Sequence, residues 1–337
     1  MPAIKKLPIL ATIPRSGTWF LRYAVSFLIH LDRGGRVDDR LTGEVVGRSS
    51  GMPFDFRGFR GGPLFHAQHS MPHEHLFIGH TVCPGFAEFV DDHSWWARTP
   101  FHVPGYDYLH EGLNYAYTPI DLAADVAYTP LSVRALDRAA AAGRGAPMAL
   151  VYRNPLAQAA SHFRYGVGHP DPAYNTVDGQ PLARMPFRDY LFASALPSYA
   201  KQFVSFQAMA ERHRGLVRLM PHECLMARPV EVLADLLNHL QGTARCDWRN
   251  LHHAVRLARR EHLRAIETEL GHSLDGTRAA NISHMPSGRF EETLHNRLRE
   301  DVIERLQWMG VDTDLLVWST AGTRGDLQQQ EGRVAVE

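Results

Sequence analysis

The turn Arg15–Thr18, with the sequence Arg-Ser-Gly-Thr, could bind an anion. An apolar run before it predicts a strand, and apolar residues at helical spacing after it predict a helix. This order places unpaired backbone N–H groups, two hydroxyls and a guanidinium at a helix start, where an anion is stabilised. An ordinary turn with a Ser or Thr cap would show the same pattern. The turn is not a Walker A loop, because it has one glycine and no Lys after it.

Other polar residues that could do chemistry lie where predicted strands end. His80 follows the second predicted strand and Arg153 follows the third. Ser161 comes eight positions after Arg153, about two turns along a predicted helix. Ligands bind beyond the carboxyl ends of the strands in open parallel sheets, so these side chains are site candidates. Taken singly, Arg153 also suits a surface loop, Ser161 helix packing and His80 a strand cap.

Several segments together resemble the sulfotransferases that use 3′-phosphoadenosine 5′-phosphosulfate (PAPS). TIPRSGTWF resembles the family's 5′-phosphosulfate loop, whose pattern is close to TYPKSGTTW. RNPLAQAAS, which runs from Arg153 to Ser161, resembles the family's 3′-phosphate element, RNPxDxxxS. HLFIGHTVCP is similar to the KTHLP segment that carries the catalytic His, and MPHECLMARP is similar to the YEDMxxxP segment.

The resemblance implies a role for each matching residue. His80 matches the catalytic base, and Arg15 matches a cation that neutralises the leaving phosphate. Arg153 and Ser161 match residues that hold the 3′-phosphate. The residues expected around the 5′-phosphosulfate and the adenine are Arg15, Ser16, Gly17, Thr18, Trp19, Phe20 and His222. A core position is the alternative for Phe20, and an ordinary loop position is the alternative for His222.

Two departures from the family pattern remove positive charge. The Lys that precedes the catalytic His by two places is Ile78 in this chain. The last nucleotide element of the family, RKGxxGxWK, is matched in part by Gly288 and Phe290, but residues 283–285 are Ser, His and Met. Gly288 and Arg289 are retained as nucleotide-binding candidates, and Arg278 is a further cation nearby.

The alternation of strands and helices predicts the fold class. It indicates an α/β three-layer sandwich, with a central parallel β-sheet flanked by helices. The resemblance makes this a P-loop-like sulfotransferase fold with long insertions. We expect one domain over 1–320, insertions at about 32–75 and 86–118 that shape the acceptor site, and a polar tail over 321–337. Strands are predicted over 9–13, 76–79, 148–152 and 216–220, and helices over 18–31, 122–142, 155–165, 187–213, 229–240, 252–270 and 289–309.

Composition limits the class of partner. The chain has 36 basic and 36 acidic residues, and zero net charge argues against a protein that coats nucleic acid. Three scattered cysteines favour a reducing, cytoplasmic location over a disulfide framework. No run approaches the roughly 18 apolar residues that predict a membrane span. The sequence does not indicate the oligomeric state.

The remaining segments suggest an acceptor and leave rival functions open. The histidine-rich segment 66–75 is interrupted by Pro72, so we do not expect a metal site, and the chemistry requires no metal. The aromatic segment 95–117 suits a small-molecule acceptor that is hydrophobic, phenolic or a sugar. One rival is a nucleotide-binding module without catalysis, motivated by the missing cations. The other is a kinase-like nucleotide transferase, which would need Mg²⁺-binding carboxylates and a phosphate-binding Lys.

Overall fold

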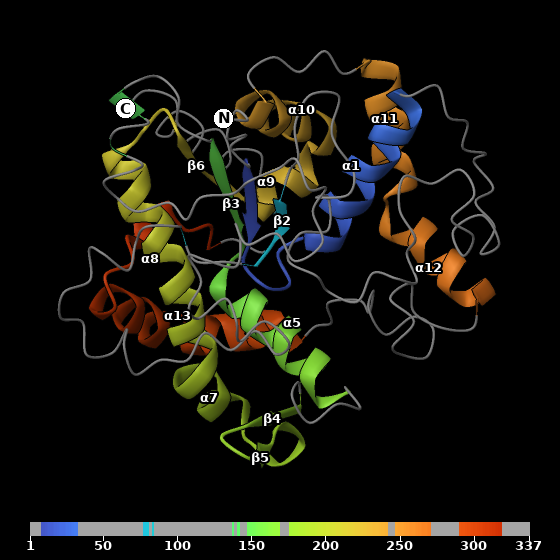
Figure 1. The fold of residues 1–337 in the computed structure, drawn as a ribbon. Helices are drawn as coiled ribbons and strands as arrows, with labels where there is room; N and C mark the ends of the chain where they lie inside the picture. Colours follow the sequence, from blue (N-terminus) through green and yellow to red (C-terminus); the bar gives the residue numbers. More distant parts are fainter. Residues whose placement is uncertain are drawn as a thin grey trace.

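In the part of the chain that the structure describes, a four-stranded parallel sheet lies at the centre (Figure 1). The computed structural model describes residues 8–32, 77–80, 83, 137, 140–141, 147–168, 175–241, 247–270 and 290–318. The strand order is β2-β1-β3-β6, with bounds of Phe77–Gly79, Ile9–Thr12, Met148–Tyr152 and Val217–Pro221. Each of the four predicted strands is confirmed to within one residue at either end.

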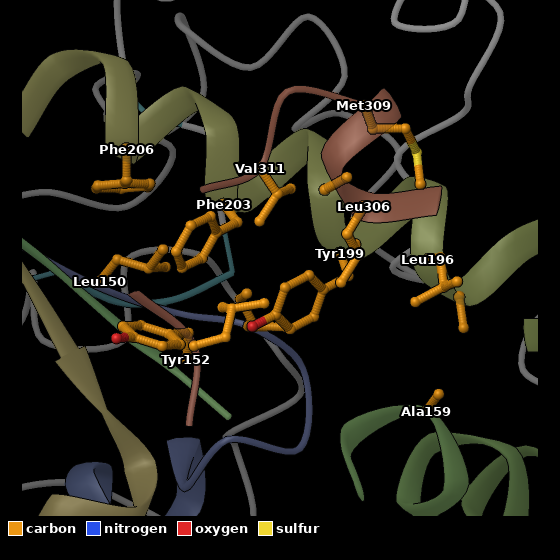
Figure 2. Packing of buried hydrophobic residues seen from close by; sticks show 14 of the residues in the cluster. Leu150, Tyr152, Ala159, Leu196, Tyr199, Phe203, Phe206, Leu306, Met309 and Val311 are labelled. Atoms are coloured by element: carbon orange, nitrogen blue, oxygen red, sulfur yellow. The ribbon is translucent and has the colours of Figure 1, made fainter. Parts of the chain in front are cut away.

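Two hydrophobic cores cover the two faces of this sheet. Leu10, Ala149 and Val151 pack into one core together with α1, α10 and α11. Their neighbours Ile9 and Leu150 point to the opposite face and pack against α5, α8 and α13 (Figure 2). Successive side chains of a strand point to opposite faces, so apolar strands buried on both faces need helices on both sides. The predicted three-layer α/β sandwich is confirmed.

Eight longer elements form the helical layers of the described residues. The predicted helices after β1 and β3, before the β6 strand and at the C-terminal side are all present, with small changes of their ends. The bounds are α1 (Thr18–Asp32), α5 (Pro155–Val167), α8 (Leu196–Arg212), α9 (His222–Ala227), α10 (Pro229–Gln241), α11 (Trp248–Leu257), α12 (Arg260–Leu270) and α13 (Phe290–Trp308).

The helix predicted over 187–213 contains a π-helical segment. It begins as α7 (Phe187–Tyr190), widens into a π-helix over Leu191–Ala195, and continues as α8. Pro197 lies in the first turn of α8 and has no backbone N–H to donate to the preceding turn. A π segment directly before a proline is a known way to accommodate the missing bond and the ring. The helical direction is therefore kept through the proline.

Two local features differ from the sequence predictions. The helix predicted over 252–270 is two helices, α11 and α12, which are separated at Ala258 and Arg259. No Gly or Pro stands at this break, so hydrophobic spacing alone joined the two. A short hairpin of β4 (Thr176–Val177) and β5 (Gln180–Pro181) was not predicted, although its Asp-Gly turn, with both residues at positive φ, is a hairpin signal.

Several predictions fall outside the described residues. The insertions at about 32–75 and 86–118 and the tail over 321–337 lie almost wholly outside them, and the helix predicted over 122–142 is described only at three helical positions, 137, 140 and 141. Two short 3₁₀ turns, Leu182–Arg184 and Thr313–Leu315, complete the described elements. Among the described residues, no helix has the length and apolar character needed to cross a membrane.

Candidate functional site

The loop between β1 and α1 has a backbone shape that only some residues tolerate. Arg15 has φ 69° and Gly17 has φ 88°, both in the left-handed region. For Arg15 this conformation costs energy, so the surrounding contacts must hold it. Gln158 of α5 donates from Nε2 to the Pro14 carbonyl at 2.9 Å, and the Ser16 amide donates to the Ile13 carbonyl at 3.0 Å. The loop is therefore fixed from both sides.

Gly17 is required for space as well as for conformation. A Cβ at this position would come within 3.0 Å of Cδ2 of the His222 ring. The first turn of α9 thus lies directly against the loop. Burial lowers the pKa of His222 to about 3, and the nearby Arg153 charge contributes to the shift. His222 is therefore a neutral ring at physiological pH that lies against the loop at Gly17.

The side-chain hydroxyl of Ser16 is buried and makes no hydrogen bond. Its side chain is fully buried, and Oγ has no hydrogen-bond partner. Burying a hydroxyl without a partner costs free energy, so such groups in folded proteins commonly await a ligand or water. Ser16 lies just before α1, whose first turn has no acidic residue and presents the unpaired amides of a helix start. Hydroxyl, amides and helix dipole together suit an anion.

His80 is held at the end of β2 by the end of β1. Its Nδ1 lies 2.7 Å from the Thr12 carbonyl oxygen and 3.1 Å from the Thr12 hydroxyl. A carbonyl only accepts, so Nδ1 carries the proton, and the neutral ring then has its lone pair on Nε2. The Thr12 hydroxyl is in turn 2.7 Å from the hydroxyl of Thr18, the first residue of α1. These contacts link His80 to the loop between β1 and α1. The bond to the Thr12 carbonyl also sets the tautomer of the His80 ring.

Helix α8 fastens the same ends of the strands from the opposite face. Gln202 donates from Nε2 to the Thr12 carbonyl at 2.9 Å, and Tyr199 donates its hydroxyl to the Arg153 carbonyl at 2.8 Å. Ser205 accepts from the Cys83 amide at 2.8 Å. These three residues recur at a spacing of three and lie on one helix face. The sequence analysis did not identify them, since their partners are backbone groups far away in the chain.

The turn after β3 is held by several hydrogen bonds of Asn154. These bonds fix the backbone next to Arg153, from which the Arg153 side chain extends. The Asn154 amide donates to Oε1 of Glu223 at 3.0 Å, and its side-chain oxygen caps α5 by accepting from the Ala157 amide at 3.0 Å. Its Nδ2 donates to the Val317 carbonyl at 3.0 Å. Burial raises the pKa of Glu223, while the Asn154 amide and the Arg153 charge oppose the rise.

The structure brings Arg15 and Ser161 into contact. Arg15 donates from Nε to Oγ of Ser161 at 3.3 Å, and its guanidinium lies 4.6 Å from the centroid of the Tyr165 ring. Tyr165 follows Ser161 by one helical turn, so both contacts lie on one face of α5. The loop predicted to bind a 5′-phosphosulfate therefore adjoins the helix predicted to bind a 3′-phosphate.

The remaining predicted residues divide between the helix core and the undescribed segments. Trp19 and Phe20 lie in the first turn of α1, are partly buried and pack against the hydrophobic core. Trp19 stacks on Tyr23, one turn along the same helix, at a centroid distance of 5.7 Å. Thr18 is buried and bonded to Thr12. Gly288, Arg289 and Arg278, the segments 66–75 and 95–117, and residues 283–285 lie outside the described residues. Where the structure is described, no three metal-binding side chains gather at one point.

Comparison with known proteins gives likenesses of structure. No protein-family model matches the sequence, and no curated protein matches it. Among solved structures, the chain is similar to the mouse sulfotransferase SULT7A1 complexed with PAP, with a TM-score of 0.48 and 12% identity over 93% of this chain and 88% of that one. It is also similar to retinol dehydratase in complex with androsterone and inactive cofactor PAP, with a TM-score of 0.49 and 14% identity, and to retinol dehydratase with retinol and PAP, with a TM-score of 0.49 and 15% identity. Both of those likenesses cover 94% of this chain and 84% of the other.

Proposed function

We propose that this protein is a PAPS-dependent sulfotransferase that acts on a hydroxyl group of a small molecule. The observation that carries the proposal is the pairing of an oriented histidine with an anion loop: Nδ1 of His80 is held by Thr12, and Thr12 in turn contacts Thr18 at the start of α1. A base and an anion site joined through one residue suit the transfer of an anionic group to a hydroxyl.

The residues fit the donor at both of its charged ends. Arg15, the Ser16 hydroxyl and the amides at the start of α1 would hold the 5′-phosphosulfate, with Gly17 allowing close approach of the backbone. Arg153 and Ser161 would hold the 3′-phosphate. Trp19, Phe20 and His222 remain candidates for the neighbourhood of the adenine, as do Gly288 and Arg289 for the rest of the nucleotide. PAPS supplies the activated sulfuryl group, and the protein supplies alignment, charge and a base.

The reaction moves one sulfuryl group and one proton. Nε2 of His80 takes the proton of the acceptor hydroxyl as that oxygen bonds to sulfur. The bond from sulfur to the phosphate oxygen breaks, and its electron pair leaves with adenosine 3′,5′-bisphosphate (PAP). Arg15 and the loop amides bind the charge that develops on this phosphate, because a guanidinium and a helix start both stabilise it. Ile78 is fully buried and supplies no charge.

The test removes the base and keeps the anion site. His80→Ala should lower transfer from PAPS by about 10²- to 10⁴-fold, because a positioned base contributes that much, while PAP affinity stays within about twofold. The measurement is mass detection of sulfated products from a panel of phenols, hydrophobic alcohols and sugars, with calorimetry for PAP. His252→Ala, an exposed histidine on α11, is the matched control and should retain full activity.

Each rival function predicts a different outcome of this experiment. If the protein is a nucleotide-binding module without catalysis, then the unmodified protein, His80→Ala and His252→Ala should all bind PAP, and none should sulfate an acceptor. A kinase-like transferase would be stabilised by Mg²⁺-ATP in a thermal-shift assay and not by PAPS. Undiminished transfer by His80→Ala would show that another group acts as the base.

A further inference from the structure

One face of helix α5, which lies below the strand ends in Figure 1, contacts the loop between β1 and α1. The contacts come from Gln158, Ser161 and Tyr165, which occupy positions i, i+3 and i+7 of the helix. Gln158 holds the loop backbone, because its Nε2 donates to the Pro14 carbonyl at 2.9 Å. The other two residues contact the side chain of Arg15. Helix α5 therefore determines where this cation lies.

The ring of Tyr165 attracts the guanidinium of Arg15. The guanidinium carbon, Cζ, lies 4.6 Å from the ring centroid, within the roughly 6 Å over which an aromatic face attracts a cation. Both residues are partly buried, so water screens this attraction less than at an open surface. Nε of the same guanidinium donates to Oγ of Ser161 at 3.3 Å. A ring and a hydroxyl from one helix thus hold one cation.

The position of the Arg15 guanidinium decides how well it binds a phosphate. An Arg side chain has many rotamers, and ordering it at the moment when an anion binds costs free energy. Its hydrogen bonds to a phosphate are also directional, since the donors form a planar fork. A contact that orders the guanidinium before the nucleotide arrives therefore raises the affinity, and it does so without touching the nucleotide.

The loop backbone fixes only the start of the Arg15 side chain. Gln158 and the φ of 69° at Arg15 set the direction in which the side chain leaves the loop. The outer part is set by what it touches, and its contacts include Ser161 and Tyr165. The proposed function assigns the 3′-phosphate to Ser161, whereas it assigns Tyr165 no contact with the nucleotide. The Tyr165 ring is thus the contact whose purpose the nucleotide itself does not explain.

We propose that Tyr165 is a positioning residue that holds the Arg15 guanidinium for the nucleotide. This inference rests on the proposed function, which gives Arg15 its phosphate, and it names a residue that the sequence analysis did not identify. Tyr165 acts through the face of its ring, so its hydroxyl is not required. Its effect on nucleotide binding passes entirely through Arg15.

The experiment changes Tyr165 with and without the guanidinium in place. Tyr165→Leu should weaken PAP binding by about three- to tenfold, because the attraction that orders Arg15 is lost. Tyr165→Phe keeps the ring face and should bind PAP within about twofold of the unmodified protein. In an Arg15→Met background, Tyr165→Leu should change the PAP affinity by less than about twofold, since there is no guanidinium left to position. Calorimetry measures affinity, and thermal unfolding shows that each variant is folded.

Phe163→Leu is the matched control on the same helix. Phe163 is also a partly buried aromatic residue, but its ring packs against Phe187 at a centroid distance of 5.5 Å and against Tyr190 at 5.1 Å. Its replacement should lower the unfolding temperature, because packing between rings is lost, and leave the PAP affinity within about twofold. The control separates the loss of an aromatic ring from α5 from the loss of support for Arg15.

Three results would overturn the inference and leave the proposed function standing. PAP binding by Tyr165→Leu as tight as in the unmodified protein would show that Arg15 needs no support from the ring. An equal loss in Tyr165→Phe and Tyr165→Leu would assign the effect to the hydroxyl. An undiminished loss in the Arg15→Met background would show that Tyr165 acts by a route that bypasses Arg15. If the unmodified protein binds neither PAP nor PAPS, the proposed function fails, and the inference fails with it.

Discussion

Ser16 is a fully buried residue whose hydroxyl makes no hydrogen bond within the described part of the protein. A second serine, Ser205, is equally buried, yet its hydroxyl accepts from the Cys83 amide and donates to the Gln202 carbonyl at 2.6 Å. Ser16 has no such partner. Two serines with the same burial therefore differ in what they do for the folded protein. The Ser205 hydroxyl contributes to stability through its two hydrogen bonds, whereas the Ser16 hydroxyl is buried without one, which is what the proposed anion site requires.

This contrast yields a prediction for a pair of matched variants. Ser16→Ala should leave the free energy of unfolding unchanged or slightly raised, because no hydrogen bond is lost, and should weaken PAP binding by about fivefold or more. Ser205→Ala should lower the free energy of unfolding by about 1–3 kcal/mol and leave PAP affinity nearly unchanged. Urea unfolding and calorimetry measure the two quantities. A clear loss of stability in Ser16→Ala, with PAP affinity intact, would show that the hydroxyl is structural.

Asn154 is a single residue that joins two elements, since it follows β3 and caps α5. It lies two residues after the end of β3, caps α5 and bonds to Val317 near the end of the described chain. The backbone of its neighbour Arg153 is held by this corner, because Asn154 makes three hydrogen bonds and the Arg153 carbonyl accepts from the Tyr199 hydroxyl. The Asn-Pro sequence predicts a helix start here, since a cap followed by proline is favourable. It does not reveal the bonds to Val317 and Glu223.

Removal of the Asn154 cap should therefore affect stability and binding together. Asn154→Ala loses the bonds to the Ala157 amide and the Val317 carbonyl, and should lower the free energy of unfolding by about 2 kcal/mol. It should also weaken PAP binding, because the Arg153 side chain would start from a less fixed position. Asp247→Ala removes the exposed cap of α11, where Asp247 accepts from the Arg249 amide at 2.8 Å. This control should cost about 1 kcal/mol of stability and leave PAP affinity unchanged.

At the scale of the whole molecule, the site is the place where both layers of helices meet the strand ends. Helices α1 and α9 reach it from one face of the sheet, and α5 and α8 from the other (Figure 1). Each of these helices belongs to a hydrophobic core, as Figure 2 shows for Tyr199 and Phe203 of α8 beside Tyr152 of β3. Packing of the cores thus sets the distances within the site. Global stability and binding geometry therefore depend on the same contacts.

The neutral His222 makes global stability sensitive to acid. Its pKa is lowered to about 3 in the folded protein, below the ordinary value of about 6.5 that it regains on unfolding. The unfolded chain then binds the proton more strongly, so stability from this group is complete above about pH 6.5 and falls as the pH decreases toward 3. The loss is at most about 1.4 kcal/mol for each pH unit.

We predict that the free energy of unfolding depends less on pH in His222→Gln than in the unmodified protein. His222→Gln should lose less stability than the unmodified protein between pH 7 and pH 4, and His252→Gln, at an exposed position, should follow the unmodified profile. Urea unfolding at each pH provides the free energies. Parallel profiles for His222→Gln and the unmodified protein would mean that His222 is not held neutral by the fold.

The sequence alone determined the order of elements and the position of the loop, because these depend on local patterns. An apolar run, a turn and helical spacing indicate β1, Arg15–Thr18 and α1, and the Arg-Asn-Pro corner indicates the start of α5. Where patterns are silent, the sequence analysis failed: the break between α11 and α12 has no Gly or Pro, and the π segment before Pro197 lies within one continuous helical pattern.

Tertiary structure decided which distant groups meet. Gln202 reaches the Thr12 carbonyl across 190 positions of the chain, and Arg15 reaches Ser161 across 146. The buried and unpartnered hydroxyl of Ser16 and the tautomer of His80 also follow from packing. None of these has a local signal, since hydrogen bonds to backbone groups and repulsion between charges depend on distance in space. The sequence placed candidates at the ends of strands, and the packing of the two cores made them into one site.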